Sequence, residues 1–211
     1  MKEYKLPIGC DVPETIILAD GDFPSHPLAL EWLRQCPYVV CCDGAANTYI
    51  RSGRMPKAIV GDGDSLLPDI KERYASLIHS EAEQETNDLS KAFRFCLSQE
   101  RKRITIMGAT GKREDHTIGN VSLLADYMEQ AEVSMMTDYG IFVPIREDSM
   151  FESYIGQQIS VFNMNSTALS AEGLAYPLSV FTNWWQGTLN EALARHFIIR
   201  TEGKVLVFRV F

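Results

Sequence analysis

The sequence has no long hydrophobic run. Its apolar runs are short, such as residues 15–19 and 205–208, and none approaches the roughly 18 apolar residues that a membrane-spanning helix needs. The opening residues, MKEYKLPIGCDVPE, also lack the apolar core of a secretory signal. We therefore expect a cytoplasmic protein that does not insert into a membrane.

Basic residues are outnumbered by acidic ones. The 211-residue chain has 20 lysines and arginines against 28 aspartates and glutamates, which gives a formal net charge of −8. A nucleic-acid backbone is bound by clustered positive charge, so this balance argues against nucleic acid as the main partner. Hydrophobic residues make up 45% of the chain, enough to build one large domain or two small ones.

Cysteine is scarce and its spacing is irregular. The five cysteines are an odd number without CxxC spacing, and Cys41 and Cys42 are adjacent. Structural zinc sites and disulfide frameworks both use regular pairs. We expect buried, reduced thiols, in agreement with a cytoplasmic location.

Short apolar runs alternate with amphipathic stretches over residues 1–137. The apolar runs are 15–19, 38–42, 58–60, 104–107 and 133–136, and the helical patterns are 28–35, 45–52, 68–77, 88–98 and 117–129. In the pattern 88–98, Leu89, Phe93, Cys96 and Leu97 recur at helical spacing. Alternating strands and helices predict an α/β domain with a mostly parallel, Rossmann-like sheet.

The rhythm changes near residue 138. From there the chain carries short strand-like runs at 141–145, 158–162, 178–181, 196–200 and 204–211. The last two flank Thr201-Glu202-Gly203, which is typical of a hairpin. We predict a second, all-β domain over residues 138–211, built as a small sandwich.

Four expected strands of the first domain end in clusters of glycine and aspartate. The clusters are Asp20-Gly-Asp22, Asp43-Gly-Ala-Ala-Asn47, Gly61-Asp-Gly-Asp-Ser65 and Gly108-Ala-Thr-Gly111. Ligands of open α/β sheets bind outside the carboxyl ends of the strands, so these clusters should converge there. Glycine lets backbone N–H groups approach a phosphate, and the helix N-termini that follow favour anions.

The carboxylates of these clusters would repel phosphates unless a cation joined them. Mg²⁺ takes oxygen ligands and bridges carboxylates to phosphate oxygens. The candidate ligands are Asp43, Asp62, Asp64 and Asp88. The competing interpretation is that aspartate and glycine only cap helices and form turns.

Several familiar motifs fail on spacing. The run from Gly108 to Lys112 has two residues between its glycines, whereas a P-loop needs four. An EF-hand starting at Asp62 would need glutamate where the chain has Arg73. Lys112 and Arg113 instead place positive charge at the start of the helix expected from residue 117.

Taken together and in this order, the polar segments resemble those of thiamine pyrophosphokinases. The matching stretches are 43–47, Pro56 with 61–65, 84–88 with Lys91, and 108–116 with Asn120; a weaker match runs from 169–174 to 187–190. The resemblance implies transfer of the pyrophosphoryl group of ATP to thiamine, with Mg²⁺ as cofactor and AMP as the second product. It also implies a homodimer whose active sites lie at the dimer interface, with thiamine held between the two subunits. Residues 1–137 would bind ATP and metal, while residues 138–211 would bind thiamine and form the dimer contact.

The resemblance assigns roles to individual residues. Asp43, Asp62, Asp64 and Asp88 would hold Mg²⁺; Asp64 or Asp88 would accept the hydroxyl proton of thiamine, and Arg113 would stabilise phosphate oxygens. The residues expected at the nucleotide are Asp43, Gly44, Asn47, Ser65, Asn87, Lys91, Gly108, Thr110, Gly111, Asp115 and His116. A lone histidine such as His116 is more often a structural hydrogen-bonding residue than a catalyst.

Thiamine would be bound by residues from both domains. The expected contacts are Gln84, Trp184, Trp185, Thr188 and Asn190. The two indoles suit stacking on a cationic ring, and in a strand one of them would face the core and the other outward. The family commonly has Thr-Asp where this chain has Asn87-Asp88, and Thr-Ser-Asn where it has Thr188-Leu189-Asn190.

Two other functions fit parts of the sequence. One is a metal-dependent nucleotidyl- or glycosyltransferase that uses Asp62-Gly-Asp64 as its DxD element. The other is a nucleotide-binding module without catalytic activity. Release of AMP from ATP and thiamine separates both from a pyrophosphokinase.

Overall fold

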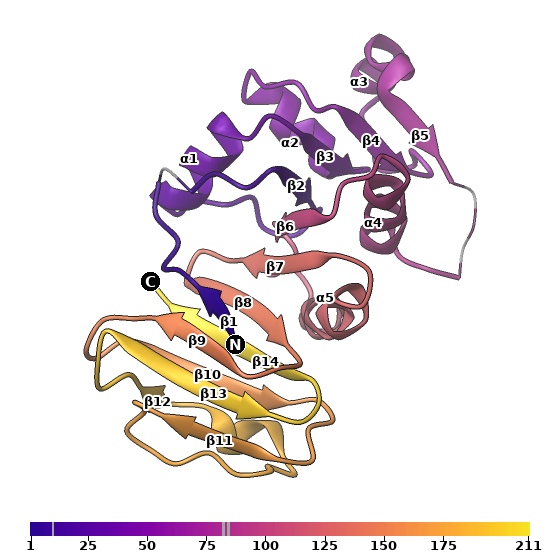
Figure 1. The fold of residues 1–211 in the computed structure, drawn as a ribbon. Coiled ribbons are helices and arrows are strands. Elements are labelled where there is room, and N and C mark those ends of the chain that lie inside the picture. The colour runs from indigo at the N-terminus through magenta and orange to yellow at the C-terminus, as the bar shows by residue number, and fades with distance from the viewer. Residues whose placement is uncertain (10, 82, 84) are drawn as a thin grey trace.

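The computed structural model describes residues 1–9, 11–81, 83 and 85–211, which form two sheets and five α-helices (Figure 1). One sheet has ten strands in the order β12-β10-β14-β8-β7-β6-β2-β3-β4-β5, and the other has four in the order β1-β9-β13-β11. The larger sheet runs without interruption from the α/β part into the β part.

The α/β part contains the six strands at one end of the large sheet. They are β2 (Thr15–Leu18), β3 (Val39–Cys42), β4 (Ala58–Gly61), β5 (Ile78–Ser80), β6 (Arg103–Met107) and β7 (Glu132–Met136). All their pairings with one another are parallel. The mostly parallel sheet predicted from the alternating pattern is therefore confirmed.

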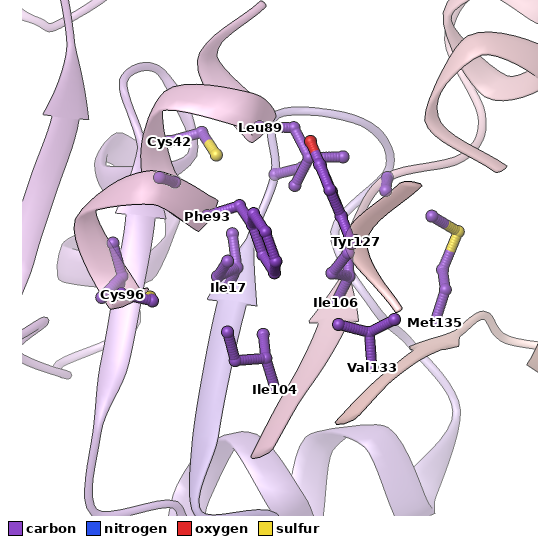
Figure 2. Close-up of a cluster of buried hydrophobic side chains, with 14 of the residues drawn as sticks. Ile17, Cys42, Leu89, Phe93, Cys96, Ile104, Ile106, Tyr127, Val133 and Met135 are labelled. Atoms are coloured by element: carbon purple, nitrogen blue, oxygen red, sulfur yellow. The ribbon is translucent and has the colours of Figure 1, made fainter. Parts of the chain in front are cut away.

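Helices cover both faces of this sheet. They are α1 (Pro27–Gln35), α2 (Ala45–Arg51), α3 (Pro68–Arg73), α4 (Asp88–Ser98) and α5 (Glu114–Tyr127), with a 3₁₀ turn η1 (Ala75–Leu77) after α3. Leu33, Tyr49 and Ile70 from α1, α2 and α3 share one core cluster. Phe93 of α4 and Tyr127 of α5 stack with ring centroids 3.9 Å apart in the cluster on the other face (Figure 2).

The strand order makes the carboxyl ends of β2 and β6 a topological switch point of the sheet. From β2 the chain builds outward through β3, β4 and β5, and it then returns to add β6 on the other side of β2. Loops after β2 and β6 therefore leave neighbouring strands in opposite directions. Such a switch point is where open α/β sheets bind their ligands.

The β part is a sandwich of the rest of the large sheet and the small one. The strands are β8 (Gly140–Ile145), β10 (Gln158–Asn163), β12 (Asn190–Glu191) and β14 (Val205–Val210) in the large sheet, and β1 (Lys2–Tyr4), β9 (Ser149–Glu152), β11 (Leu169–Glu172) and β13 (His196–Thr201) in the small one. Phe151, Phe197 and Val207 are fully buried between the sheets. The predicted sandwich is confirmed.

Several details differ from the sequence-based expectations. Residues 178–181, expected as a strand, are irregular, and of these aliphatic side chains only Leu178 is buried. The segment around the two adjacent tryptophans is a 3₁₀-helix, η2 (Trp184–Gly187), rather than a strand. Residues 2–4 pair in parallel with β9, so the start of the chain contributes to the sandwich. The division after residue 137 falls in the turn between β7 and β8 and stays a prediction.

Among the described residues, no helix is both long and apolar enough to cross a membrane.

Candidate active site at the carboxyl ends of the parallel strands

Three aspartates from the loops after β3 and β4 lie together. One carboxylate oxygen from each of Asp43, Asp62 and Asp64 lies within 4.8 Å of the others. Asp43 directly follows β3, and Asp62 and Asp64 follow β4, the next strand of the sheet. Gly63 lies between Asp62 and Asp64 in the chain and has a φ of 78°. Residues other than glycine rarely adopt this backbone conformation, so the turn suits glycine.

Asp43 is the buried member of this acid cluster. Its Oδ2 accepts a hydrogen bond from the Ser65 backbone N–H at 3.2 Å, whereas its Oδ1 is buried and has no hydrogen-bond partner among the described residues. Burial raises the pKa of Asp43 to about 6, and the nearby carboxylates of Asp88, Asp64 and Asp62 add to the rise. A buried anionic oxygen without a donor is costly unless a cation or a proton satisfies it.

Asp88, the fourth predicted ligand, approaches from the first residue of α4. A methyl group added at Gly61 would lie 2.8 Å from Cβ of Asp43 and 3.4 Å from Cγ of Asp88, which places both side chains against the same backbone. Lys91 Nζ donates to Asp88 Oδ1 at 3.1 Å, and Lys91 is buried. Burial alone would lower the pKa of Lys91, but the hydrogen bond and the charge of Asp88 raise it overall.

The donor set fits a hard divalent cation. All candidate ligands are carboxylates, the type of oxygen donor that Mg²⁺ prefers. The unpartnered Oδ1 of Asp43 supplies an oxygen that nothing else in the described structure satisfies. Lys91 offsets part of the negative charge from the α4 side.

Two further predicted residues form hydrogen bonds with residues 62–67, the loop between β4 and α3 that carries Asp62 and Asp64 and is called here the acid loop. Asn47 Nδ2 donates to the Ser65 carbonyl at 2.8 Å, and Asn47 Oδ1 accepts from the Leu67 N–H at 3.0 Å. Ser65 Oγ donates to Asp64 Oδ1 at 2.9 Å. The Asn47 amide is thus engaged in holding the loop, and the Ser65 hydroxyl orients an acid.

The loops after β2 and β6 are joined along their backbones. Gly21 N donates to the Gly108 carbonyl at 2.6 Å, and Asp22 N donates to the Thr110 carbonyl at 2.9 Å. A methyl group at Gly21 would lie 2.3 Å from Thr110 O, so only glycine fits there. Lys112 Nζ then reaches back to Asp20, with 2.8 Å to its carbonyl and 3.1 Å to its Oδ1.

Asp20 connects this pair of loops to the start of α2. A methyl group at Gly44 would lie 2.6 Å from Asp20 Oδ2 and 3.2 Å from Ser65 Cβ. Gly44, Gly108, Thr110 and Gly111 are therefore gathered around the same edge as the acid cluster. On the α4 side, Asn87 caps the helix by accepting from Ser90 N at 2.9 Å, and its Nδ2 donates to Asn120 Oδ1 at 3.2 Å.

The charged residues at the start of α5 are exposed. Arg113 Nη2 lies 2.6 Å from Asp115 Oδ2, and this ion pair raises the pKa of Arg113 and lowers that of Asp115. His116 is exposed in the same turn. The structure pairs two of the predicted nucleotide contacts, Arg113 and Asp115, with each other at the rim.

Of the residues predicted to bind thiamine, the two tryptophans are exposed, whereas Thr188 and Asn190 form hydrogen bonds to the backbone of the same segment. Trp184 and Trp185 are 45% and 73% exposed, so the expectation that one of them faces the core is wrong; a 3₁₀-helix does not alternate its side chains as a strand does. The Asn190 amide is buried and bridges the Tyr176 backbone, with 2.8 Å to its carbonyl and 3.0 Å from its N–H. Thr188 Oγ1 donates to the Trp185 carbonyl at 2.7 Å. Gln84 lies outside the described residues.

One contact of the acid loop was not anticipated from the sequence. Lys71 on α3 donates from Nζ to the Gly63 carbonyl at 2.8 Å, directly between the two aspartates of the loop. Its charge partly offsets their repulsion. A lysine in the helix that follows an acidic loop was the available signal, but many surface lysines share that position.

Comparison with known proteins places this site in a family. A family model for the catalytic domain of thiamin pyrophosphokinase matches residues 29–136, slightly more than half of the 211 residues, and a model for the substrate-binding domain of thiamin pyrophosphokinase matches residues 140–208. The chain belongs to the thiamin pyrophosphokinase family. The junction between the two matched regions coincides with the turn between β7 and β8.

Individual relatives agree with the family assignment. Thiamine pyrophosphokinase 1 of Oryza sativa subsp. japonica is 30% identical over 49% of this chain and 49% of that protein. Thiamine pyrophosphokinase of Bacillus subtilis is 34% identical over 39% of this chain and 40% of that protein. The chain thus matches about half the length, or less, of these curated relatives.

Solved structures share the fold along the whole chain. Thiamin pyrophosphokinase from Candida albicans superposes with a TM-score of 0.81 at 18% identity, covering 100% of this chain and 93% of that one. Thiamine pyrophosphokinase from Bacillus subtilis superposes with a TM-score of 0.77 at 21% identity, covering 93% and 98%. At these identities the likeness establishes the architecture.

Proposed function

We propose that this protein transfers the pyrophosphoryl group of ATP to the hydroxyl of thiamine, forming thiamine diphosphate and AMP. The observation that carries the proposal is the acid cluster of Asp43, Asp62 and Asp64 at the carboxyl edge of the sheet of a thiamin pyrophosphokinase family member. One buried oxygen of this cluster, Asp43 Oδ1, has no hydrogen-bond partner within the described part of the chain. Family membership supplies the substrates, and the cluster supplies a site suited to phosphate chemistry.

The acid cluster is proposed to hold Mg²⁺ through Asp43, Asp62 and Asp64, with Asp88 beside them. When bound, this cation would neutralise charge on the phosphate oxygens of ATP. Asp64 is an exposed acid of the cluster, and its Oδ1 already accepts a hydrogen bond from Ser65. Asp64 or Asp88 would accept the hydroxyl proton of thiamine as the oxygen attacks the β-phosphorus of ATP.

Two lysines on different loops and helices would supply positive charge for the phosphates. Lys91 is fixed against Asp88, and Lys112 is fixed against Asp20. Phosphoryl transfer depends mainly on positioning and charge stabilisation, which fixed cations provide without reorganisation. Arg113 lies at the rim, where its partner Asp115 is exposed and can be exchanged for phosphate oxygens.

The β part, residues 138–211, is proposed to recognise thiamine and to form a homodimer. Its segment 176–189, called here the apolar patch, has five exposed large apolar side chains: Tyr176, Val180, Trp184, Trp185 and Leu189. Exposed apolar patches of this kind mark binding surfaces, and indoles stack well on cationic rings. Gln84 would contribute from the α/β part, whereas Thr188 and Asn190 support the patch by ordering its backbone.

Assembly gives a direct test of this patch. We expect sedimentation to show a dimer of about 48 kDa, twice the 23.8 kDa of one chain. A cytoplasmic location is part of the same proposal. A protein that stays monomeric at micromolar concentration and still turns over thiamine would contradict a site shared between subunits.

The activity itself is tested by measuring AMP from ATP and Mg²⁺, with and without thiamine. We expect AMP only when thiamine is present. Transfer to a sugar or nucleotide acceptor instead would identify a DxD-type transferase. Stabilisation by ATP without any turnover would identify a binding module.

A further inference from the structure

The turn between β7 and β8 holds the loop that follows β2. The Asp138 carboxylate accepts four hydrogen bonds within this loop: Ser25 N lies 2.9 Å from Oδ1 and 3.1 Å from Oδ2, Ser25 Oγ lies 2.5 Å from Oδ2, and His26 N lies 2.9 Å from Oδ1. Burial alone would raise the pKa of Asp138, but these hydrogen bonds lower it below its usual range. The carboxylate is therefore held in its charged form by the loop.

A second contact ties the same loop to the end of the chain. The His26 ring stacks on Phe211 with centroids 4.5 Å apart, and Phe211 N donates to the Tyr139 carbonyl at 3.2 Å. His26 is also the N-cap of α1, where its Nδ1 accepts from Leu28 N at 3.3 Å. The loop end is thus fixed both by the β7–β8 turn and by the residue that follows β14.

The other end of the loop forms part of the candidate active site. Asp20 holds the ammonium of Lys112 there, and Gly21 and Asp22 pair with the loop after β6. Residues 20–26 therefore run from the edge of the sheet where the nucleotide is proposed to bind, called here the nucleotide edge, to the junction of the α/β and β parts. Only a few residues separate the anchor at Ser25 from the contacts at Asp20 and Asp22.

We propose that Asp138 is a positioning residue, which anchors residues 20–26 so that Asp20 keeps Lys112 at the nucleotide edge. The inference rests on the proposed function for its kinetic consequence, but the anchoring itself does not. Asp138 lies between the regions matched by the two family models, 29–136 and 140–208. Its carboxylate touches neither the acid cluster nor the exposed apolar patch in any contact of the described structure, so its effect on catalysis is indirect.

A structural role alone would make a different prediction. If Asp138 only stabilised the fold, its removal would lower the melting temperature and leave the affinity for ATP unchanged. An anchor of the loop instead affects the loop's mobility and the Michaelis constant for ATP, with little effect on thiamine. These two quantities separate the interpretations.

The experiment compares Asp138→Ala with Asp148→Ala. Asp148 is a matched control, because its carboxylate also bridges segments, accepting from Arg200 at 3.1 Å and from Thr201 N at 3.2 Å, but within the β part. Arg200 keeps a second partner, Glu172, at 2.8 Å when Asp148 is removed. Both variants are examined by hydrogen exchange, by melting, and by kinetics with ATP and thiamine varied separately.

For Asp138→Ala we expect faster amide exchange over residues 20–26 and a Michaelis constant for ATP raised about tenfold, equivalent to about 1.4 kcal/mol. The constant for thiamine should change less than twofold, and Asp148→Ala should change neither constant. Ser25→Ala removes a single hydrogen bond and provides a milder variant, with about a threefold effect on ATP. Unchanged exchange over residues 20–26 together with an unchanged constant for ATP would overturn the proposal.

Failure of the proposed function is recognised separately. A wild-type protein that releases no AMP would refute the pyrophosphokinase activity. Hydrogen exchange over residues 20–26, in Asp138→Ala against wild type, would then still decide whether Asp138 anchors the loop: faster exchange supports the anchor and unchanged exchange overturns it.

Discussion

At the scale of single residues, the acid cluster is the feature on which the chemistry depends. Asp62 and Asp64 are held in place by backbone and hydroxyl donors, and neither belongs to the hydrophobic core. Their substitution should therefore separate activity from folding. We expect Asp62→Asn and Asp64→Asn each to abolish turnover, because each removes a charge proposed to bind Mg²⁺.

Circular dichroism and the AMP assay on each variant check this expectation. The matched control is Asp69→Asn, which changes an exposed acid in the first turn of α3. It should retain activity. Turnover near the wild-type level in both Asp62→Asn and Asp64→Asn would remove these residues from the metal site.

A second prediction at this scale concerns Asp43 and the folding stability of the protein without divalent cations. Because its pKa is raised to about 6 in the folded protein, above the ordinary aspartate value, ionisation of Asp43 costs folding free energy. The contribution of Asp43 to stability is therefore most favourable below about pH 4 and is lost as the pH rises through 6. Asp43→Asn removes the ionisation.

In the presence of a chelator at pH 7, we expect Asp43→Asn to be more stable than wild type by on the order of 2 kcal/mol in unfolding free energy. Its melting temperature should be correspondingly higher. The difference should shrink toward pH 4. Asp126→Asn, which changes an exposed acid on α5, should show no such pH-dependent gain. A variant less stable than wild type at pH 7 would contradict the assignment of a strained, buried charge.

At the scale of elements, η2 and α4 use their aromatic residues in opposite ways. Phe93 of α4 is 2% exposed and stacks on Tyr127, whereas Trp185 of η2 is 73% exposed. We expect Phe93→Ala to cost about 3–5 kcal/mol of stability. Trp185→Ala should cost well under about 1 kcal/mol, because little buried area is lost.

Substrate kinetics complete this comparison. A stacking contact with a cationic ring contributes roughly 1–2 kcal/mol, so Trp185→Ala should raise the Michaelis constant for thiamine about five- to thirtyfold and leave that for ATP little changed. Trp184, whose ring meets Phe162 edge-on at 6.1 Å, is the natural comparison. If neither variant alters the dependence on thiamine, the substrate is bound elsewhere.

The sequence predicted those helices and strands whose residue spacing and capping residues lie within the element itself. The helix 88–98 was correct at both ends because its apolar residues recur at helical spacing and Asn87 caps it. The short strands β1 and β9 were missed, since each has three or four residues and forms only through pairing with distant segments. The run 178–181 was wrongly predicted because its aliphatic residues suit a strand but find no pairing partner.

The candidate site also has a part that the sequence predicted and a part that it did not. Glycine and aspartate after each strand placed Asp43, Asp62 and Asp64 at one edge, since parallel strands share their carboxyl ends. The contact of Asp138 with Ser25 could not be predicted, because the residues are 113 positions apart and neither belongs to a motif. Long-range polar contacts of this kind leave no periodic signal.

At the scale of the whole molecule, one sheet serves both proposed tasks. Its parallel strands present the acid cluster, and its antiparallel strands form one layer of the sandwich that carries the apolar patch. The β7–β8 pairing joins the two parts through continuous backbone hydrogen bonds. In the proposed homodimer, the nucleotide site of one protomer and the thiamine site of its partner would lie together, and in-line transfer requires that contact.

The most direct measurement is a phosphorus NMR time course of purified protein with thiamine and Mg·ATP. We expect both phosphates of the pyrophosphoryl group to move together, so that thiamine diphosphate and AMP appear in equal amounts and ADP does not accumulate. Asp62→Asn should give neither product. Formation of ADP with thiamine monophosphate, or of AMP with free pyrophosphate, would contradict pyrophosphoryl transfer by this protein.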